Sequence, residues 1–243
     1  GSEMCIRDRG WDGSNNEIDL VTKTVEPRGD EKELAEITDL IGSYTTNFAS
    51  SSAGRAKNVI TGVSKVDGTI LYPGEEFDLA KTVSPFTQEN GYELAGAYQN
   101  GTVVESFGGG ICQVATTLYN AVIRAELEIT MRFNHSMLVH YVEPSMDAAI
   151  AGNYKDLKFK NNLDAPVYIE GYCSGGIIYF NVYGKATRPS NREISFESET
   201  VSKTDPKVQF TMDASLTAGS VSVTQSGPVS YTHLRAHETP EHL

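Results

Sequence analysis

Residues 108–125 read GGGICQVATTLYNAVIRA, and this stretch predicts the centre of the fold. After the three glycines, small and apolar residues recur with the period of about 3.6 residues that marks a helix burying one face. The residues on that face are Ala115, Leu118, Ala121, Val122 and Ala125. We therefore expect a helix that starts directly after a glycine turn and packs into the core of the domain.

Cys112 lies in the first turn of this predicted helix. Unpaired N–H groups and the positive end of the helix dipole favour a thiolate there, and the same N–H groups can hold an oxyanion. Glycines before it, including Gly109 and Gly110, let the backbone turn sharply and approach a ligand. The motif fits a cysteine nucleophile, but it also fits a small cysteine buried for packing.

The flanking sequence supplies the other expected elements. Residues 31–48 place Leu34, Ile37, Ile41 and Tyr44 on one helical face, and residues 55–66 predict a second helix. Residues 69–77 predict a short strand that ends in a Pro-Gly turn. Residues 167–173 and 177–183 are β-branched and aromatic runs joined by Ser-Gly-Gly, which predicts a hairpin. The predicted fold is α+β: a single mixed domain with N-terminal helices, a glycine turn into a central helix, and a C-terminal antiparallel hairpin sheet.

The ends of the chain are expected to lie outside this domain. Residues 1–9 and 229–243 read as the translation of a transposon-type sequencing adapter and of its reverse complement. We expect residues 10–35 to be a linker or the end of a preceding domain, and residues 36–188 to form the domain itself. Residues 189–228 are rich in Ser and Thr and predict the start of a truncated, small all-β wall-associated module. The chain is thus expected to be a fragment of a longer protein.

Composition excludes several classes of function. The 243 residues carry a net charge of −12, which argues against binding to nucleic acid or to anionic lipid. No apolar run approaches the roughly 20 residues of a transmembrane helix. Away from the ends the chain has only Cys112 and Cys173, without the C-x-x-C spacing of a zinc or redox motif. A disulfide between these two cysteines remains an alternative that would remove the nucleophile.

A second polar motif, RFNHSM at residues 132–137, contains the expected partner of the cysteine. A thiol nucleophile needs a base, and His135 in a polar turn suits that role. Asp147 is the expected group that orients His135, with Asn134, Ser136 or a main-chain carbonyl as alternatives. Arg132 has the planar fork that binds a carboxylate, although a solvated surface charge is an equally simple interpretation.

The remaining candidates point to structural roles or weaker sites. His140 lies in an apolar run, where a histidine needs no special role. Cys173 in the hairpin is interpreted as a core residue. A metal site made of Cys112, His135 and Asp147 is a further alternative, but no two of them have close ligand spacing, and no metal or other cofactor is expected.

Taken together, these motifs resemble the VanW family over nearly all of residues 40–185. The matching motifs, in order, are Thr45-Thr46, Arg55 with Asn58-Val59, the run from Tyr72 to Phe77, Gly91-Tyr92, the run from Gly108 to Gln113, His135-Ser136, Tyr141-Val142, Asp147-Ala148-Ala149 and the run from Asp156 to Asn161. The sequence departs from the family at Asp78, where serine is common, and at Leu138, where proline is common. Neither departure touches the expected nucleophile or base.

The resemblance implies an L,D-transpeptidase of Gram-positive cell-wall peptidoglycan. Cys112 would be the nucleophile that forms a stem-peptide thioester, His135 the base and Asp147 its orienting group. With water as acceptor the same chemistry would give an L,D-carboxypeptidase. The residues expected to bind the stem peptide are Gly109, Gly110, Gln113, Arg132, Ser136 and Tyr141.

The resemblance also implies a setting for the protein. We expect an extracellular protein associated with the cell wall, with peptidoglycan stem peptides as partners and no cofactor. The alternative function is a non-catalytic peptidoglycan-binding accessory protein associated with glycopeptide resistance. The sequence alone does not separate these two functions.

Overall fold

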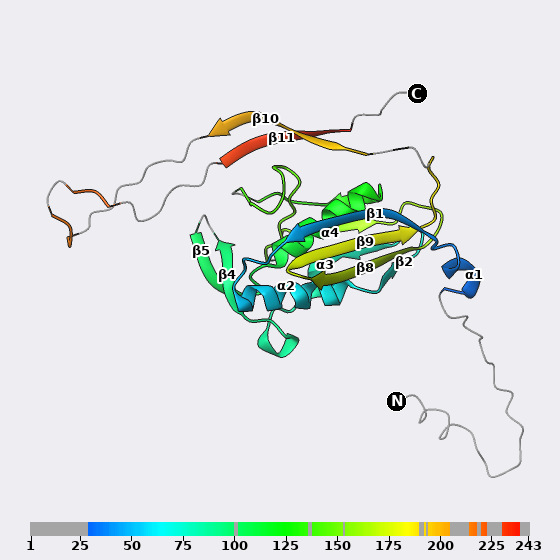
Figure 1. Cartoon of the computed structure of the whole chain (residues 1–243), viewed down its shortest axis with the longest axis horizontal. Helices are drawn as coiled ribbons and strands as arrows, with labels where there is room; N and C mark the ends of the chain where they lie inside the picture. Colours follow the sequence, from blue (N-terminus) through cyan, green and yellow to red (C-terminus); the bar gives the residue numbers. More distant parts are fainter. Residues whose placement is uncertain are drawn as a thin grey trace, which may run out of the picture. The chain divides into compact units, whose positions relative to one another are not determined.

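An antiparallel sheet of four strands forms the framework of the computed structural model (Figure 1). Its strand order is β1 (Asp39–Asn47), β9 (Ile177–Gly184), β8 (Val167–Ser174) and β2 (Thr69–Leu71). The structure describes residues 29–99, 102–135, 138–152, 154–189, 192, 194–204, 214–217, 220–222 and 230–238. Within these residues the fold is a mixture of helices and antiparallel sheets, which confirms the predicted α+β class.

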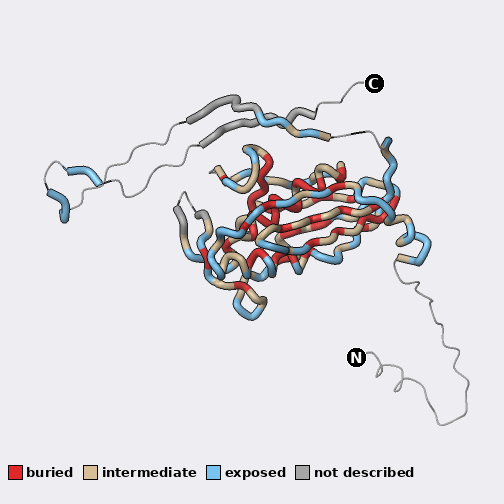
Figure 2. The backbone as a smooth tube through the Cα atoms, viewed as in Figure 1, coloured by how far each residue is buried: buried red, intermediate tan, exposed pale blue. Residues whose placement is uncertain are grey.

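Two long helices, α2 (Ala53–Val66) and α4 (Ile111–Arg124), cover the same face of this sheet. Gly42 of β1 lies against α4, since a Cβ there would be 2.5 Å from the Ala121 carbonyl oxygen. Gly171 of β8 lies against Val63 of α2. These two glycines pair with Val182 and Phe180 of β9, which lie two positions apart and are both fully buried. Because alternate residues of a strand share a face, both helices pack on one side, where Figure 2 shows the buried residues gathered.

The helix predicted after the glycine turn is confirmed as α4, and the helix predicted over residues 55–66 is confirmed as α2. All five residues predicted to be buried on α4 have no exposed surface: Ala115, Leu118, Ala121, Val122 and Ala125. Ser52 caps the N-terminus of α2, and its side chain accepts a hydrogen bond from the Arg55 N–H. The apolar period was sufficient to find both helices because both pack on the core through one continuous face.

The helix predicted over residues 31–48 is wrong. The structure has a single turn, α1 (Glu31–Leu34), followed by strand β1 from Asp39 to Asn47. Ile41 and Tyr44 do pack against the core, but they do so from a strand paired with β9. Gly42 leaves room for α4, and pairing with β9 outweighs a weak helical period because tertiary context decides the conformation of such short segments.

The predicted strand over residues 69–77 is two strands, because the Pro-Gly turn lies in its middle. Strand β2 pairs with β8, whereas β3 (Glu76–Asp78) joins a smaller sheet with β7 (Lys158–Lys160) and β6 (Glu128–Met131). The predicted C-terminal hairpin is confirmed by β8 and β9. Short helices α3 (Leu79–Val83) and η1 (Gln88–Asn90) follow β3.

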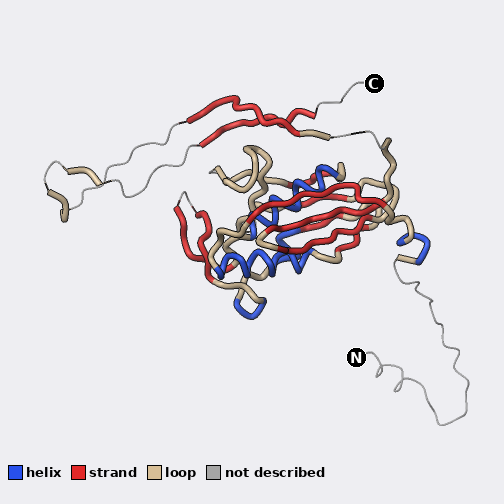
Figure 3. Tube along the Cα trace, viewed as in Figure 1, coloured by secondary structure: helices blue, strands red, loops and turns tan. Residues whose placement is uncertain are grey.

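Two further strand pairs complete the described structure, as Figure 3 shows in red. The hairpin of β4 (Leu94–Gln99) and β5 (Thr102–Phe107) leads into the glycine turn. Strands β10 (Phe196–Thr204) and β11 (Ser230–Glu238) pair with each other.

The domain boundaries stay predictions. Residues 1–28 lie outside the described part of the chain, and the boundaries after residues 35, 188 and 228 are not tested by these elements. No helix within the described residues is long and apolar enough to span a membrane.

Candidate functional site

The glycine turn before α4 is pressed against neighbouring backbone, and this contact fixes the start of the helix. A Cβ at Gly109 would lie 2.6 Å from the Ala95 carbonyl oxygen, and Gly110 has a φ of 114°, which other residues rarely adopt. Buried Asn58 of α2 donates from its amide to the Gly109 carbonyl at 3.0 Å. Cys112, two residues after Gly110, is thereby held in the first turn of α4.

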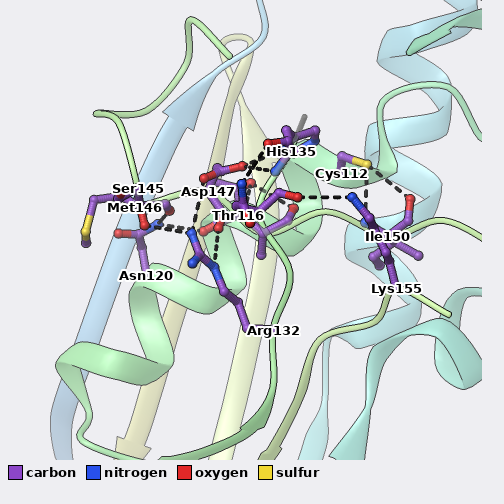
Figure 4. Close-up of polar contacts among 12 residues, drawn as sticks. Cys112, Thr116, Asn120, Arg132, His135, Ser145, Met146, Asp147, Ile150 and Lys155 are labelled. Carbon is purple, nitrogen blue, oxygen red and sulfur yellow. Dashed lines mark hydrogen bonds and ion pairs between the residues drawn. The ribbon is translucent and has the colours of Figure 1, made fainter. Parts of the chain in front are cut away.

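The thiol of Cys112 faces the segment that follows Asp147 (Figure 4). The Ile150 N–H donates to Sγ at 3.4 Å, and Sγ lies 3.4 Å from the Ile150 carbonyl oxygen. Cys112 itself is half-buried. Its own N–H, in the first turn of the helix, finds no acceptor among the residues that the structure describes. An unpaired N–H beside a nucleophilic sulfur is the donor that an oxyanion requires.

His135 and Asp147 form a tightly bonded pair beside the cysteine. One carboxylate oxygen of Asp147, Oδ2, accepts from the His135 backbone N–H at 2.6 Å and lies 2.6 Å from ring nitrogen Nδ1. The two side chains have only 9% and 10% of their surface exposed. The contact leaves the other ring nitrogen for the cysteine, and the His135 side chain interacts with the Cys112 thiol. The structure thus brings together the three residues predicted to be catalytic.

The protonation states of these three residues depend on one another. Burial opposes ionisation of Cys112, but the hydrogen bond and charge of His135 outweigh it and lower the pKa of the thiol. Burial likewise opposes the charged form of His135, yet Asp147 and Cys112 raise its pKa to about 9. Burial works against the charged form of Asp147 too, but its contacts with His135 lower its pKa. The arrangement therefore shifts Cys112, His135 and Asp147 toward the thiolate, imidazolium and carboxylate forms.

Arg132 holds Asp147 in place and has little left for a substrate. Its Nε donates to the Asp147 carbonyl at 2.7 Å, and its Nη2 donates to the Ser145 carbonyl at 2.7 Å and to Asp147 Oδ1 at 3.1 Å. The guanidinium also lies 5.3 Å from the centre of the Tyr119 ring. The planar fork predicted for a substrate carboxylate is thus engaged by the protein, and direct substrate binding by Arg132 stays a prediction.

Two polar residues of α4 that the sequence reasoning missed dock the loop carrying Asp147. The Thr116 hydroxyl donates to the Ala148 carbonyl at 3.1 Å and accepts from the Ala148 N–H at 3.0 Å. Asn120 donates from its amide to the Met146 carbonyl at 2.6 Å. Residues 112, 116 and 120 recur at intervals of four and so share one face of α4, and this spacing is the signal that could have found them.

Tyr141 and Gln113 were both predicted to contact substrate. Tyr141 interacts with residues of the candidate site, whereas Gln113 is buried and bonded to β1 and α2. Burial, followed by the charge of Cys112, raises the pKa of Tyr141, whose hydroxyl also interacts with Thr116. Gln113 is only 1% exposed. Its amide donates to Thr46 Oγ1 at 3.0 Å and to the Asn47 carbonyl, and it accepts from an arginine of α2. Gln113 therefore positions other groups, and a direct contact between it and substrate stays a prediction.

The other predictions have mixed outcomes. Ser136 lies outside the described residues, and His140 is exposed. Both Cys112 and Cys173 are free, so the alternative of a disulfide between them is wrong. Burial raises the pKa of Cys173 to about 11, which fits an unreactive core thiol. Among the described residues there is no group of three or more His, Cys, Asp or Glu side chains placed to hold a metal ion.

The chain is similar to a known protein family and to two curated proteins. A family model described as "VanW like protein" matches residues 54–183, which is more than half of the chain. The Bacillus subtilis protein YoaR is 34% identical over 169 residues, covering 69% of this chain and 56% of that protein. The vancomycin B-type resistance protein VanW of Enterococcus faecalis is 26% identical over 118 residues, covering 46% of this chain and 42% of that protein. The chain thus spans about half the length of these curated relatives, and no solved structure matches it.

Proposed function

This chain belongs to the VanW family, and on that premise we propose that it is a cysteine-dependent L,D-transpeptidase of peptidoglycan. The observation that carries the proposal is the position of Cys112 at the start of α4, where the charge of His135, held by Asp147, lowers the pKa of the thiol. A thiolate paired with an imidazolium is the reactive form of a cysteine nucleophile, and a carboxylate on the far ring nitrogen orients the base.

In the first half-reaction, the Cys112 thiolate attacks the carbonyl carbon of the third residue of a tetrapeptide stem. The carbonyl oxygen becomes an oxyanion, which the Cys112 N–H stabilises. The C–N bond to the terminal D-alanine then breaks, and the His135 imidazolium gives its proton to the leaving amine. The products are a thioester on Sγ and free D-alanine.

In the second half-reaction, the side-chain amine of another stem attacks the thioester. Neutral His135 takes the proton of the amine, the C–S bond breaks, and the Cys112 thiolate is restored with its imidazolium partner. One peptide bond has been broken and one formed. With water as the attacking group, the same steps release a shortened stem, which is the L,D-carboxypeptidase outcome.

The relatives suggest where this chemistry takes place. The Enterococcus faecalis relative is named as a vancomycin B-type resistance protein. An extracellular, wall-associated location for the protein, with stem peptides as its partners, is part of the same proposal. The acidic chain, at a net charge of −12, gives no support to nucleic acid as a partner.

The test is a disaccharide tetrapeptide incubated with the purified protein, followed by measurement of released D-alanine and of cross-linked dimers by mass spectrometry. Cys112→Ala should abolish both products, because it removes the group that holds the acyl intermediate. Cys173→Ala is the matched control and should keep the wild-type rate, since that thiol lies in the sheet with its pKa raised to about 11.

The histidines allow a second matched comparison. His135→Ala should slow both products by about 10²–10⁴-fold, the usual contribution of a general acid–base group, whereas exposed His140→Ala should not. Dimer formation by Cys112→Ala at the wild-type rate would refute the nucleophile. Tight binding of the stem by the wild type without release of D-alanine would favour the non-catalytic accessory function instead.

A further inference from the structure

Arg55 of α2 lies against the start of α4, beside the nucleophile. A Cβ at Gly110 would be 3.0 Å from Arg55 Cγ and 3.3 Å from the Arg55 carbonyl oxygen. The guanidinium Nη2 donates to Gln113 Oε1 at 2.8 Å. Arg55 therefore contacts residues on both sides of Cys112, although 57 positions separate Arg55 and Cys112 in the sequence.

The guanidinium of Arg55 is fixed in position and keeps donors available. Nη1 donates to Ser51 Oγ at 2.6 Å, and the bond to Gln113 holds the other end of the fork. Gln113 is itself held by the end of β1, so its oxygen cannot swing away. A guanidinium has about five N–H groups, and these two contacts leave the rest of them for another acceptor. Within the described part of the chain Arg55 makes no ion pair with a carboxylate.

Two other cations near the thiol, Arg132 and Lys155, contact the segment around His135. Arg132 is engaged by Asp147 and Ser145, whereas Lys155, whose charge helps to lower the pKa of Cys112, donates to the Asn134 carbonyl at 3.2 Å and holds the chain beside His135. The charge of Arg55 does reach the interior of the site, since it partly opposes the rise in the pKa of Tyr141 that burial and Cys112 cause. In a chain of net charge −12, an arginine without a carboxylate beside a nucleophile indicates an anionic ligand.

We propose that Arg55 binds the free C-terminal carboxylate of the donor peptide and so selects donors that end one residue beyond the bond attacked by Cys112. This inference rests on the proposed function and names the chemistry of its substrate. Consecutive residues are spaced by about 3.8 Å, so an anchor next to Cys112 is within reach of a carboxylate one residue past the scissile carbonyl. A planar fork suits a carboxylate because the two can form paired N–H···O bonds.

The test compares two donors, the tetrapeptide stem with a terminal carboxylate and the same stem ending in a carboxamide. For the wild type, kcat/KM should be about 10- to 100-fold higher for the carboxylate, as expected for a hydrogen-bonded charge pair. In Arg55→Gln the two donors should differ by less than about 3-fold. The quantity compared is the carboxylate-to-carboxamide ratio of kcat/KM, in the wild type and in Arg55→Gln. A poorer leaving group in the carboxamide affects both proteins equally, and a lost Gln113 contact affects both donors equally. Neither effect therefore changes the comparison of the two ratios.

Lys57→Gln is the matched control, since it also removes one cation from α2. Lys57 is exposed and pairs with Glu93 at 2.6 Å. It should keep the wild-type preference for the carboxylate. A wild-type protein that uses both donors equally, or an Arg55→Gln variant that keeps the full preference, would overturn the anchor while leaving the transpeptidase proposal intact.

A binding experiment separates failure of the anchor from failure of the catalytic proposal. Cys112→Ala and the double variant Cys112→Ala/Arg55→Gln are titrated calorimetrically with the carboxylate and carboxamide tetrapeptides. The carboxylate should bind about 10-fold or more tightly than the carboxamide only when Arg55 is present. Equal affinities in Cys112→Ala would refute the anchor even if the wild type releases D-alanine, and a clear difference would support it even if no turnover is found.

Discussion

Replacing Asp147 with asparagine removes the charge that stabilises the His135 imidazolium and nearly preserves the side-chain shape. Oδ2 of Asp147 contacts both the backbone N–H and ring Nδ1 of His135 at 2.6 Å, and only 10% of its side chain is exposed. Without the carboxylate, the proton shared between His135 and Cys112 moves from the ring to the sulfur, because the imidazolium has lost its counter-charge. The reactive thiolate should therefore become scarcer.

The size of the effect follows from the pKa of His135. That pKa is raised from 6.5 to about 9, and the bond to Asp147 is the largest contribution to the rise. A neighbouring opposite charge shifts a pKa by about 1–3, so the pKa of His135 should fall by about 1–2 in Asp147→Asn. At about 1.4 kcal/mol per unit, the ion pair loses roughly 1.4–2.8 kcal/mol relative to the neutral pair. The thiolate fraction near neutral pH should fall by about 10-fold or more.

The assay is the rate of iodoacetamide alkylation of Cys112 between about pH 5 and pH 9, with peptide mass mapping to separate it from Cys173. The wild type should react well below the usual thiol pKa of about 8.5, and Asp147→Asn should approach an ordinary thiol profile. Asp164→Asn, which removes an exposed carboxylate, is the control and should leave the profile unchanged. Identical profiles for wild type and Asp147→Asn would refute the linkage between these groups, whatever substrate the protein uses.

Two further predictions follow from the same geometry. Gly109→Ala should lower the free energy of unfolding by about 1–3 kcal/mol or more, because its Cβ would meet the Ala95 carbonyl oxygen at 2.6 Å. Gly68→Ala is the control, since its Cβ would meet nothing within 4 Å and only its φ of 80° is unfavourable. It should lower the free energy of unfolding, measured in urea, by only about 1 kcal/mol. A plot of kcat/KM against pH should be bell-shaped, since catalysis needs deprotonated Cys112 and protonated His135. Its acid limb should lie below the ordinary pKa of a thiol, and its alkaline limb near pH 9, where His135 loses its proton; an activity that keeps rising above pH 10 would contradict a protonated His135 as the general acid.

Local patterns in the sequence predicted those parts of the fold in which local and tertiary preferences agree. The apolar period of α4 and the aromatic, β-branched runs of β8 and β9 each describe an element that buries one regular face. Strand β1 could not be predicted in this way. Its apolar residues fit a helical period, and only the pairing with β9 and the contact of Gly42 with α4 decide for a strand.

The candidate site divides along the same line. Cys112, His135 and Asp147 were singled out in the sequence by residue type and motif, and the structure brings the three together, although their catalytic roles stay predictions. The arginines were assigned less well, since a guanidinium next to the motif histidine looks available until its partners are known. Arg132 proves to hold Asp147, whereas Arg55 contacts Gln113, the neighbour of Cys112, only because α2 and α4 pack side by side. Contacts between residues that are distant in the sequence leave no local signal.

The bonds between the Asp147 loop and α4 determine the free energy needed to open the site. One hydroxyl, that of Thr116, satisfies both backbone groups of Ala148, as a neighbouring strand would, and Asn120 anchors the loop two residues earlier. Together with the bonds of Arg132, these contacts lie outside the four-stranded sheet, so we expect the loop to open locally while the sheet stays intact. The amide protons of Ala148 and Ile150 should then exchange with solvent through a local opening, faster than those of β8 and β9. We therefore expect this local opening, rather than global unfolding, to set the fraction of molecules with an assembled site, so that a substitution in the loop lowers the reactivity of Cys112 in a protein that remains folded.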